Sequence, residues 1–159
     1  MFKNNKIIIC GGGTGGHLFP AMAISDVLYK NGADILYIGS KHGIESTKIS
    51  KNINAFFLNI KGIHRTLSLS NIIDNFFLPF RLILSIIKSI IIIYKFNPNV
   101  VIGTGGYSSG VPLISAIILR KKIIIQEQNS YPGLTNRTLS KFADKVFISY
   151  ESSKKYFKK

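Results

Sequence analysis

Two glycine-rich segments, each preceded by an apolar run, are the parts of this chain best suited to chemistry. Residues 11–16 read Gly-Gly-Gly-Thr-Gly-Gly after three isoleucines and a cysteine, and residues 103–107 read Gly-Thr-Gly-Gly-Tyr after Val-Val-Ile. Glycine lets a ligand approach the main chain closely, and a helix that begins there directs free N–H groups at an anion. The two loops predict a phosphate-bearing ligand held between them. A glycine turn that serves packing alone is the alternative.

The first loop satisfies the G-x-G-x-x-G pattern of dinucleotide sites, but the rest of such a site is missing. That site needs an acid at the end of the second strand, whereas here the strand ends Tyr-Ile-Gly-Ser at residues 37–40 and Asp34 stands at its start. A P-loop is excluded because no Gly-Lys-Ser/Thr closes the run. The loop is therefore expected to cradle a phosphate or diphosphate in another way.

Polar residues beside the loops are candidates for acid–base work. His17 follows the first run, where the positive end of a helix favours a neutral imidazole that acts as a base; a local hydrogen bond is the alternative. Residues 126–129, Gln-Glu-Gln-Asn, end an expected strand at the edge where parallel sheets bind ligands, unless they form an exposed loop. Thr135, Asn136 and Arg137 open the next expected helix and either contact ligand or cap it.

Short Val/Ile strands alternate with helical segments, which predicts a Rossmann-like, doubly wound α/β fold with a parallel sheet buried on both faces. The expected strands are residues 6–10, 34–39, 55–60, 99–103, 122–126 and 145–149. The expected helices are residues 19–31 (with Pro20 in the first turn), 43–51, 71–96, 109–120 and 132–142. Residues 61–70 are expected to form a basic loop, and residues 151–159 to begin another helix.

Composition limits the class of protein. The 159 residues suit one domain, 46% of them are hydrophobic, and the net charge of +14 favours an anionic partner, although a general excess of lysine is the alternative explanation. The single cysteine, Cys10, fits a reducing compartment and a small buried residue. The first apolar run is too short for a signal peptide. His17, His42 and His64 are scattered, so no metal site is expected.

Residues 76–96 are the most hydrophobic segment. The longest uncharged stretches, on either side of Lys88, are six residues each, far short of the ~20 needed to span a bilayer. Helical spacing puts Arg81, Ser85, Lys88 and Lys95 on one face and apolar residues elsewhere. The pattern predicts an amphipathic helix that lies in an anionic membrane interface beside the basic loop; an ordinary core helix is the alternative.

Four motifs, at residues 12–20, 105–110, 127–129 and 133–136, resemble in order and spacing the N-terminal domain of the MurG family. These bacterial glycosyltransferases of peptidoglycan synthesis transfer N-acetylglucosamine from UDP-N-acetylglucosamine to undecaprenyl-linked lipid I, which gives lipid II. The resemblance covers essentially the whole chain. It implies the N-terminal, acceptor-binding half of a two-domain GT-B fold, with the active site in the cleft between the halves.

The resemblance also implies roles for individual residues. His17 and Glu127 match polar positions proposed for catalysis, in an inverting transfer that needs no metal or other cofactor. The positions expected to hold the acceptor diphosphate are Gly12, Gly13, Gly105, Gly106 and Tyr107. The positions expected to reach the donor are Thr14, Gly15, Gly16 and Asn129.

The family's membrane patch corresponds to residues 69–93 of this chain. The resemblance implies that it docks on the cytoplasmic face of the plasma membrane, as a peripheral contact. The side chains expected to do so are Phe76, Phe77, Leu78, Phe80, Arg81, Leu84 and Lys88.

The family's C-terminal half carries most of the donor site, and residues 1–150 are expected to form only the N-terminal domain, with residues 151–159 starting the interdomain segment. The resulting hypothesis is a half enzyme that binds acceptor and membrane and transfers sugar only with a second half, as in eukaryotic relatives that divide the halves between chains. A non-catalytic membrane-anchoring subunit of such a split enzyme is the alternative. Nucleic acid is disfavoured because the aromatic residues are mostly Phe in apolar runs, away from the basic residues.

Overall fold

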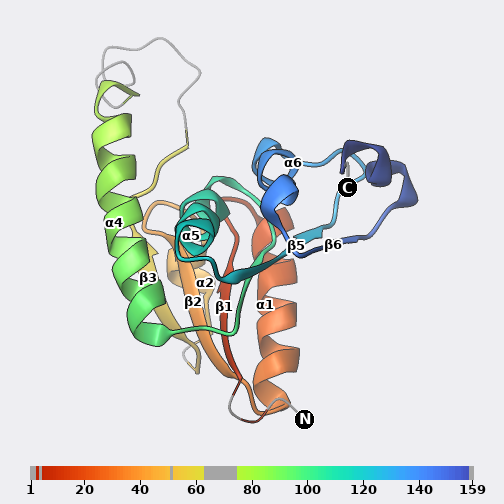
Figure 1. Ribbon diagram of the computed structural model, residues 1–159, viewed down its shortest axis with the longest axis horizontal. Coiled ribbons are helices and arrows are strands. Elements are labelled where there is room, and N and C mark those ends of the chain that lie inside the picture. The colour runs from red at the N-terminus through yellow and green to blue at the C-terminus, as the bar shows by residue number, and fades with distance from the viewer. Residues whose placement is uncertain (1–2, 4, 51, 63–74, 158–159) are drawn as a thin grey trace.

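Six parallel strands form one sheet, in the order β3-β2-β1-β4-β5-β6 (Figure 1). The computed structural model describes residues 3, 5–50, 52–62 and 75–157. The strands are β1 Lys6–Cys10, β2 Asp34–Ser40, β3 Asn54–Leu58, β4 Val100–Gly103, β5 Lys122–Glu127 and β6 Lys145–Ile148. The helices are α1 Gly15–Lys30, α2 Glu45–Lys48, α4 Leu78–Phe96, α5 Tyr107–Ile118 and α6 Leu134–Leu139, with 3-10 segments η1 Ser140–Phe142 and η2 Glu151–Tyr156.

Helices cover both faces of the sheet, with α1 on one side and α4 and α5 packed together on the other (Figure 1). The central strand β1 contributes side chains to the hydrophobic cores on both faces of the sheet, because alternate residues of a strand point to opposite faces. Ile7 and Ile9 pack with Leu18 of α1, whereas Ile8 and Cys10 pack with side chains of α4 and α5. The predicted doubly wound parallel fold is confirmed.

The two helices that follow the glycine loops begin earlier than predicted. The expected helix at 19–31 starts at Gly15, and the expected helix at 109–120 starts at Tyr107. The expectation for the first helix used Pro20 as a first-turn residue, yet Pro20 lies inside α1, as Pro112 lies inside α5. Proline lacks an N–H, so neither proline donates the usual hydrogen bond to the carbonyl four residues earlier. Both loops therefore pass directly into a helix N-terminus.

Other helix boundaries also differ from the predicted ones. The expected helix at 43–51 is reduced to α2, and the expected helix at 132–142 divides into α6 and η1. The expected long helix at 71–96 is observed in part, as α4 from Leu78 to Phe96. Residues 63–74, which hold His64, most of the expected basic loop and the start of that helix, lie outside the described residues.

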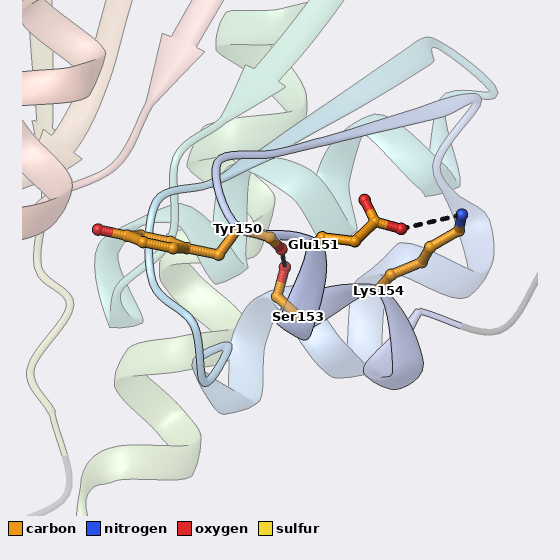
Figure 2. Close-up of polar contacts among 4 residues, drawn as sticks. All are labelled: Tyr150, Glu151, Ser153 and Lys154. Atoms are coloured by element: carbon orange, nitrogen blue, oxygen red, sulfur yellow. Dashed lines mark hydrogen bonds and ion pairs between the residues drawn. The ribbon is translucent and has the colours of Figure 1, made fainter.

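The chain continues past β6 into η2, where a helix was expected. Figure 2 shows two local contacts of this segment: the Ser153 hydroxyl donates to the Tyr150 carbonyl at 2.6 Å, and Lys154 Nζ lies 3.2 Å from a Glu151 carboxylate oxygen. Both contacts join residues three apart, the spacing that a 3-10 helix brings together. The segment is thus helical, but it is a 3-10 helix.

Candidate functional site

The two glycine loops touch each other at the carboxyl edge of the sheet. The Gly12 N–H donates to the Gly105 carbonyl at 3.3 Å, and a β-carbon at Gly106 would lie 2.0 Å from the Gly12 carbonyl oxygen. Gly105 and Gly106 also have φ of 100° and 80°, values that favour glycine. Some of the glycines are therefore required because the two loops pack against each other, as the alternative of a glycine turn that serves packing predicts.

The open donors of the first loop lie at the start of α1. Thr14 is the N-cap residue and makes no side-chain capping bond, and the first turn holds no acidic residue. The Gly13 N–H is used within the protein, by a Glu45 carboxylate oxygen at 2.8 Å. The first N–H groups of a helix have no intrahelical acceptor, and within the described part of the chain those of Gly15 and Gly16 have no other partner. They form a cradle suited to an anion.

His17 lies beside this cradle, in the first turn of α1. Its Nδ1 is 2.9 Å from the Thr14 hydroxyl, and its ring lies against Gly105 of the second loop. Burial lowers the pKa of His17 below its ordinary 6.5, while the charge of Glu127 acts in the opposite direction. The lowered pKa agrees with the expectation, but burial is its main cause. The imidazole is neutral near pH 7 and has the protonation state of a general base.

Glu127 is completely buried at the end of β5. Its Oε1 accepts hydrogen bonds from the backbone N–H and the side-chain amide of Asn129, each at 2.9 Å, and its Oε2 accepts one from the Asn136 amide at 2.9 Å. The carboxylate is thus engaged by three donors. Its direct contribution is to fix the Asn129 and Asn136 side chains and to place a negative charge near His17.

Several polar atoms of this rim are buried without a hydrogen-bond partner among the described residues. They are Gln126 Oε1, both amide atoms of Gln128, and Asn136 Oδ1. An unpaired buried polar atom is unfavourable and therefore marks a place where a ligand or water is accommodated. Sequence reasoning offered Asn136 as a ligand contact or a helix cap and Gln128 as one of the four polar residues at the strand end, but their burial is a property of the folded chain.

The supports of the first loop were missed by sequence reasoning. The Tyr37 hydroxyl donates to the Gly11 carbonyl, and the Thr104 hydroxyl donates to the His17 carbonyl at 2.7 Å. Glu45, completely buried, binds the loop from α2. Nothing in the sequence singles out Glu45, because an acid in the first turn of a short helix is usually exposed.

Cys10 and Asp34, which sequence analysis did not assign to the site, lie where expected. Cys10 is buried, and burial raises the pKa of its thiol, so the interpretation as a packed, unreactive residue is confirmed. Asp34 is at the start of β2, the edge opposite the glycine loops. Within residues 3, 5–50, 52–62 and 75–157, no group of three or more His, Cys, Asp or Glu side chains could hold a metal ion.

The outer face of α4 carries a row of exposed apolar side chains, Phe80, Ile83, Leu84, Ile87, Ile91 and Tyr94, and the exposed Phe76 and Phe77 lie just before the helix begins. Lys88 and Lys95 are exposed beside it, and Arg81 is half-buried, as is Leu78. Ser85 was expected on this basic face, but it is buried and donates to the Asn59 carbonyl at 3.3 Å. No helix of the described residues is long and apolar enough to cross a membrane.

A family model described as the glycosyltransferase family 28 N-terminal domain matches residues 7–148. Two curated relatives, both named UDP-N-acetylglucosamine–N-acetylmuramyl-(pentapeptide) pyrophosphoryl-undecaprenol N-acetylglucosamine transferase, are similar over nearly the whole chain. That of Flavobacterium psychrophilum is 43% identical over 97% of this chain and 42% of its own length. That of Christiangramia forsetii is 45% identical over 99% of this chain and 43% of its own length. The chain thus spans well under half the length of these relatives.

Solved structures of glycosyltransferases are also similar to this chain. The crystal structure of Acinetobacter baumannii MurG matches 94% of this chain and 43% of its own length, with a TM-score of 0.78 and 25% identity. A Streptomyces glycosyltransferase solved with thymidine diphosphate matches 86% of this chain with a TM-score of 0.59 and 14% identity, which supports the fold alone.

Proposed function

The chain belongs to the glycosyltransferase family 28 N-terminal domains, and from that premise we propose that it supplies the acceptor- and membrane-binding half of an N-acetylglucosaminyltransferase of peptidoglycan synthesis. The acceptor is undecaprenyl-linked lipid I, the donor is UDP-N-acetylglucosamine, and the product is lipid II. The similarity to curated transferases over 97% of the chain supports this assignment.

The observation that carries the proposal is the cradle of open N–H groups at the start of α1. Gly15 and Gly16 offer main-chain donors without a nearby acidic residue, at the sheet edge where open α/β folds bind ligands. The second glycine loop closes one side of this cradle through Gly105 and Gly106. A diphosphate, with several acceptor oxygens and negative charge, fits these donors best. The resemblance assigns Gly15 and Gly16 to the sugar donor and Gly12 and Gly13 to the acceptor diphosphate. Because the Gly13 N–H is already bound by Glu45, we propose instead that the acceptor diphosphate is bound by the N–H groups of Gly15 and Gly16.

The chemistry requires removal of a proton from the acceptor sugar hydroxyl and stabilisation of the leaving diphosphate. His17 supplies a neutral imidazole beside the cradle, which suits it to the role of base. Glu127 holds Asn129 and Asn136 in place and stabilises the imidazolium that forms when His17 takes the proton. The unpaired amide atoms of Gln128 are available to sugar hydroxyls.

Membrane contact is assigned to the apolar row on α4. The row is flanked by exposed Lys88 and Lys95, and α4 contains no acidic residue. An apolar face with adjacent cations suits an anionic bilayer surface, where burial of apolar side chains and attraction to lipid headgroups act together. We propose that the chain binds the cytoplasmic face of the membrane, where UDP-N-acetylglucosamine and the lipid I headgroup meet.

Acceptor binding is tested with a lipid I analogue that carries a short polyprenyl chain, measured by calorimetry. We expect Gly16→Ala to weaken binding, because it adds a methyl group next to an open N–H group. The nearest atom that the β-carbon meets is 3.9 Å away, so the fold tolerates the change. Gly133→Ala is the matched control, since a β-carbon there meets nothing within 4 Å. Equal affinity of both variants and the parent chain would contradict the cradle assignment.

Membrane contact is tested by co-sedimentation with phosphatidylglycerol vesicles. Phe80→Ser removes an aromatic ring from the α4 row, and Phe142→Ser removes an equally exposed ring from η1; the two side chains are 62% and 60% exposed. We expect only Phe80→Ser to reduce binding. An equal loss in both variants would indicate general hydrophobic adsorption.

The half-enzyme hypothesis is tested by a transfer assay with UDP-N-acetylglucosamine and the same analogue. We expect no lipid II product from these 159 residues alone, and product when the unmatched remainder of the Flavobacterium psychrophilum relative is added in trans. Turnover by the chain alone would refute the hypothesis. Acceptor binding without turnover in the mixture would favour the non-catalytic anchoring subunit.

A further inference from the structure

Glu45 places a carboxylate underneath the first glycine loop. It is the first residue of α2 and is completely buried. Its Oε2 accepts the Gly13 N–H at 2.8 Å, and its Oε1 accepts the Ser40 N–H at 2.9 Å. No lysine or arginine in the described part of the chain forms an ion pair with it. A buried charge is unfavourable unless hydrogen bonds compensate it, so these two backbone donors determine where it lies.

Three glycines from separate segments make the space for this carboxylate. A β-carbon at Gly12 would lie 2.5 Å from the Glu45 side chain, one at Gly39 would lie 2.7 Å from it, and one at Gly43 would lie 2.1 Å from it. Gly12 belongs to the loop itself, Gly39 to β2 and Gly43 to the turn before α2. The chain thus leaves out three side chains around one acid. Packing alone would be served as well by an apolar residue, so the arrangement points to a function for the carboxylate.

The effect of Glu45 falls on the loop main chain. By accepting the Gly13 N–H it fixes the residue just before the α1 N-cap, while the Tyr37 hydroxyl fixes the Gly11 carbonyl from the same side. The next donors along the chain, the N–H groups of Gly15 and Gly16, are then the ones left open. An unsupported glycine run would have to be ordered by the ligand, and that conformational entropy would reduce affinity.

We propose that Glu45 is a positioning residue for the anion cradle: its carboxylate holds Gly13 so that the open N–H groups of α1 are pre-arranged for the acceptor diphosphate. This inference rests on the proposed function. Glu45 does not touch the diphosphate, and the Gly13–Glu45 bond persists when the ligand is bound. A carboxylate is required because both of its oxygens accept from backbone N–H groups. A glutamine would offer one oxygen and turn an N–H₂ group towards the other donor.

The first measurement uses the unaltered chain and farnesyl diphosphate, with backbone amide exchange followed by NMR. We expect the Gly13 amide to be protected with and without the ligand, and the Gly15 and Gly16 amides to become protected only when the ligand is added. Loss of Gly13 protection on binding would overturn the inference, because the ligand would then displace Glu45. Failure of the chain to bind the diphosphate at all would instead refute the proposed function.

The second measurement compares Glu45→Gln with Glu151→Gln. Both replace a carboxylate by its isosteric amide, but the Glu151 side chain is 81% exposed on η2, where its ion pair is with Lys154 (Figure 2). We expect Glu45→Gln to weaken farnesyl diphosphate binding by about tenfold, with the far-UV CD spectrum retained, and Glu151→Gln to leave it unchanged. Unchanged affinity in folded Glu45→Gln would overturn the inference while the proposed function stands. If Glu45→Gln does not fold, the exchange measurement on the unaltered chain decides.

Discussion

Glu45 and Glu127 are both completely buried carboxylates near the same edge of the sheet, but their partners differ in kind. Glu45 binds two backbone N–H groups, whereas Glu127 binds one backbone N–H and the side-chain amides of Asn129 and Asn136. A backbone donor has a fixed direction, but an amide side chain is free to rotate and offer its oxygen instead. The comparison teaches that Glu45 shapes the main chain of the cradle, while Glu127 arranges side chains and influences the charge of His17.

The largest expected effect is on the free energy of unfolding, which should fall further for the acid that accepts more hydrogen bonds. Glu127→Ala removes three hydrogen bonds and Glu45→Ala removes two, although the Asn136 amide still has the Gln126 carbonyl as an acceptor at 3.2 Å. We expect losses in the free energy of unfolding on the order of 4 kcal/mol and 3 kcal/mol respectively. Urea unfolding of both variants measures the difference. A larger loss for Glu45→Ala would mean that donor count does not set the cost.

A double-mutant cycle sharpens the description of the Glu45 pocket. Gly43→Ala puts a β-carbon 2.1 Å from Glu45 Oε2, and such overpacking should cost about 1–3 kcal/mol. In the Glu45→Ala background the clash disappears, so the same change should be nearly neutral. Urea unfolding of the four chains gives the coupling energy. Additive losses would show that Gly43 is required for a reason unrelated to Glu45.

Isosteric amides test the difference between backbone and side-chain partners. Glu127→Gln should cost only about 1 kcal/mol, since Asn136 can rotate its unpaired Oδ1 towards the new N–H₂ group. Glu45→Gln should cost about 2 kcal/mol, because backbone N–H groups cannot rotate. Thermal unfolding at neutral pH ranks the two variants. A larger loss of stability in Glu127→Gln than in Glu45→Gln would contradict the distinction between side-chain and backbone donors.

The smallest expected effect is on the titration of His17, followed by NMR of the imidazole protons. The pKa lies below the ordinary 6.5 in the folded chain, and Glu127→Gln should lower it further because the charge that raises it is gone. Glu45→Gln should leave it unchanged. Because the folded pKa is depressed, the contribution of His17 to stability is present above 6.5 and is lost as the pH falls through 6.5 towards the folded pKa. A rise in Glu127→Gln would contradict the assigned influence of Glu127.

Sequence reasoning recovered the parts of this protein that depend on local pattern. Short apolar runs between turn signals predicted all six parallel strands to within two residues at each end, and the central strands are the Val/Ile-rich ones, because a strand buried on both faces requires continuous apolar residues. The predicted starts of the two helices that follow the glycine loops were wrong. For α1 the reason is that helix propensity penalises glycine, whereas the helix begins at Gly15 inside the glycine run. The catalytic and ligand-binding assignments from the family motifs remain predictions.

The sequence by itself determined the sheet, the two glycine loops at one edge, the polar run at the end of β5 and the amphipathic character of α4, because each follows from residue types in adjacent positions. Only the tertiary structure decided which N–H groups of the loops stay open and which acid supports them. Glu45 is 32 residues from Gly13 along the chain, and the three glycines that surround it come from separate segments. A carboxylate is stable in that position only after β2 and α2 have packed beneath the loop, and no pattern of neighbouring residues encodes that encounter.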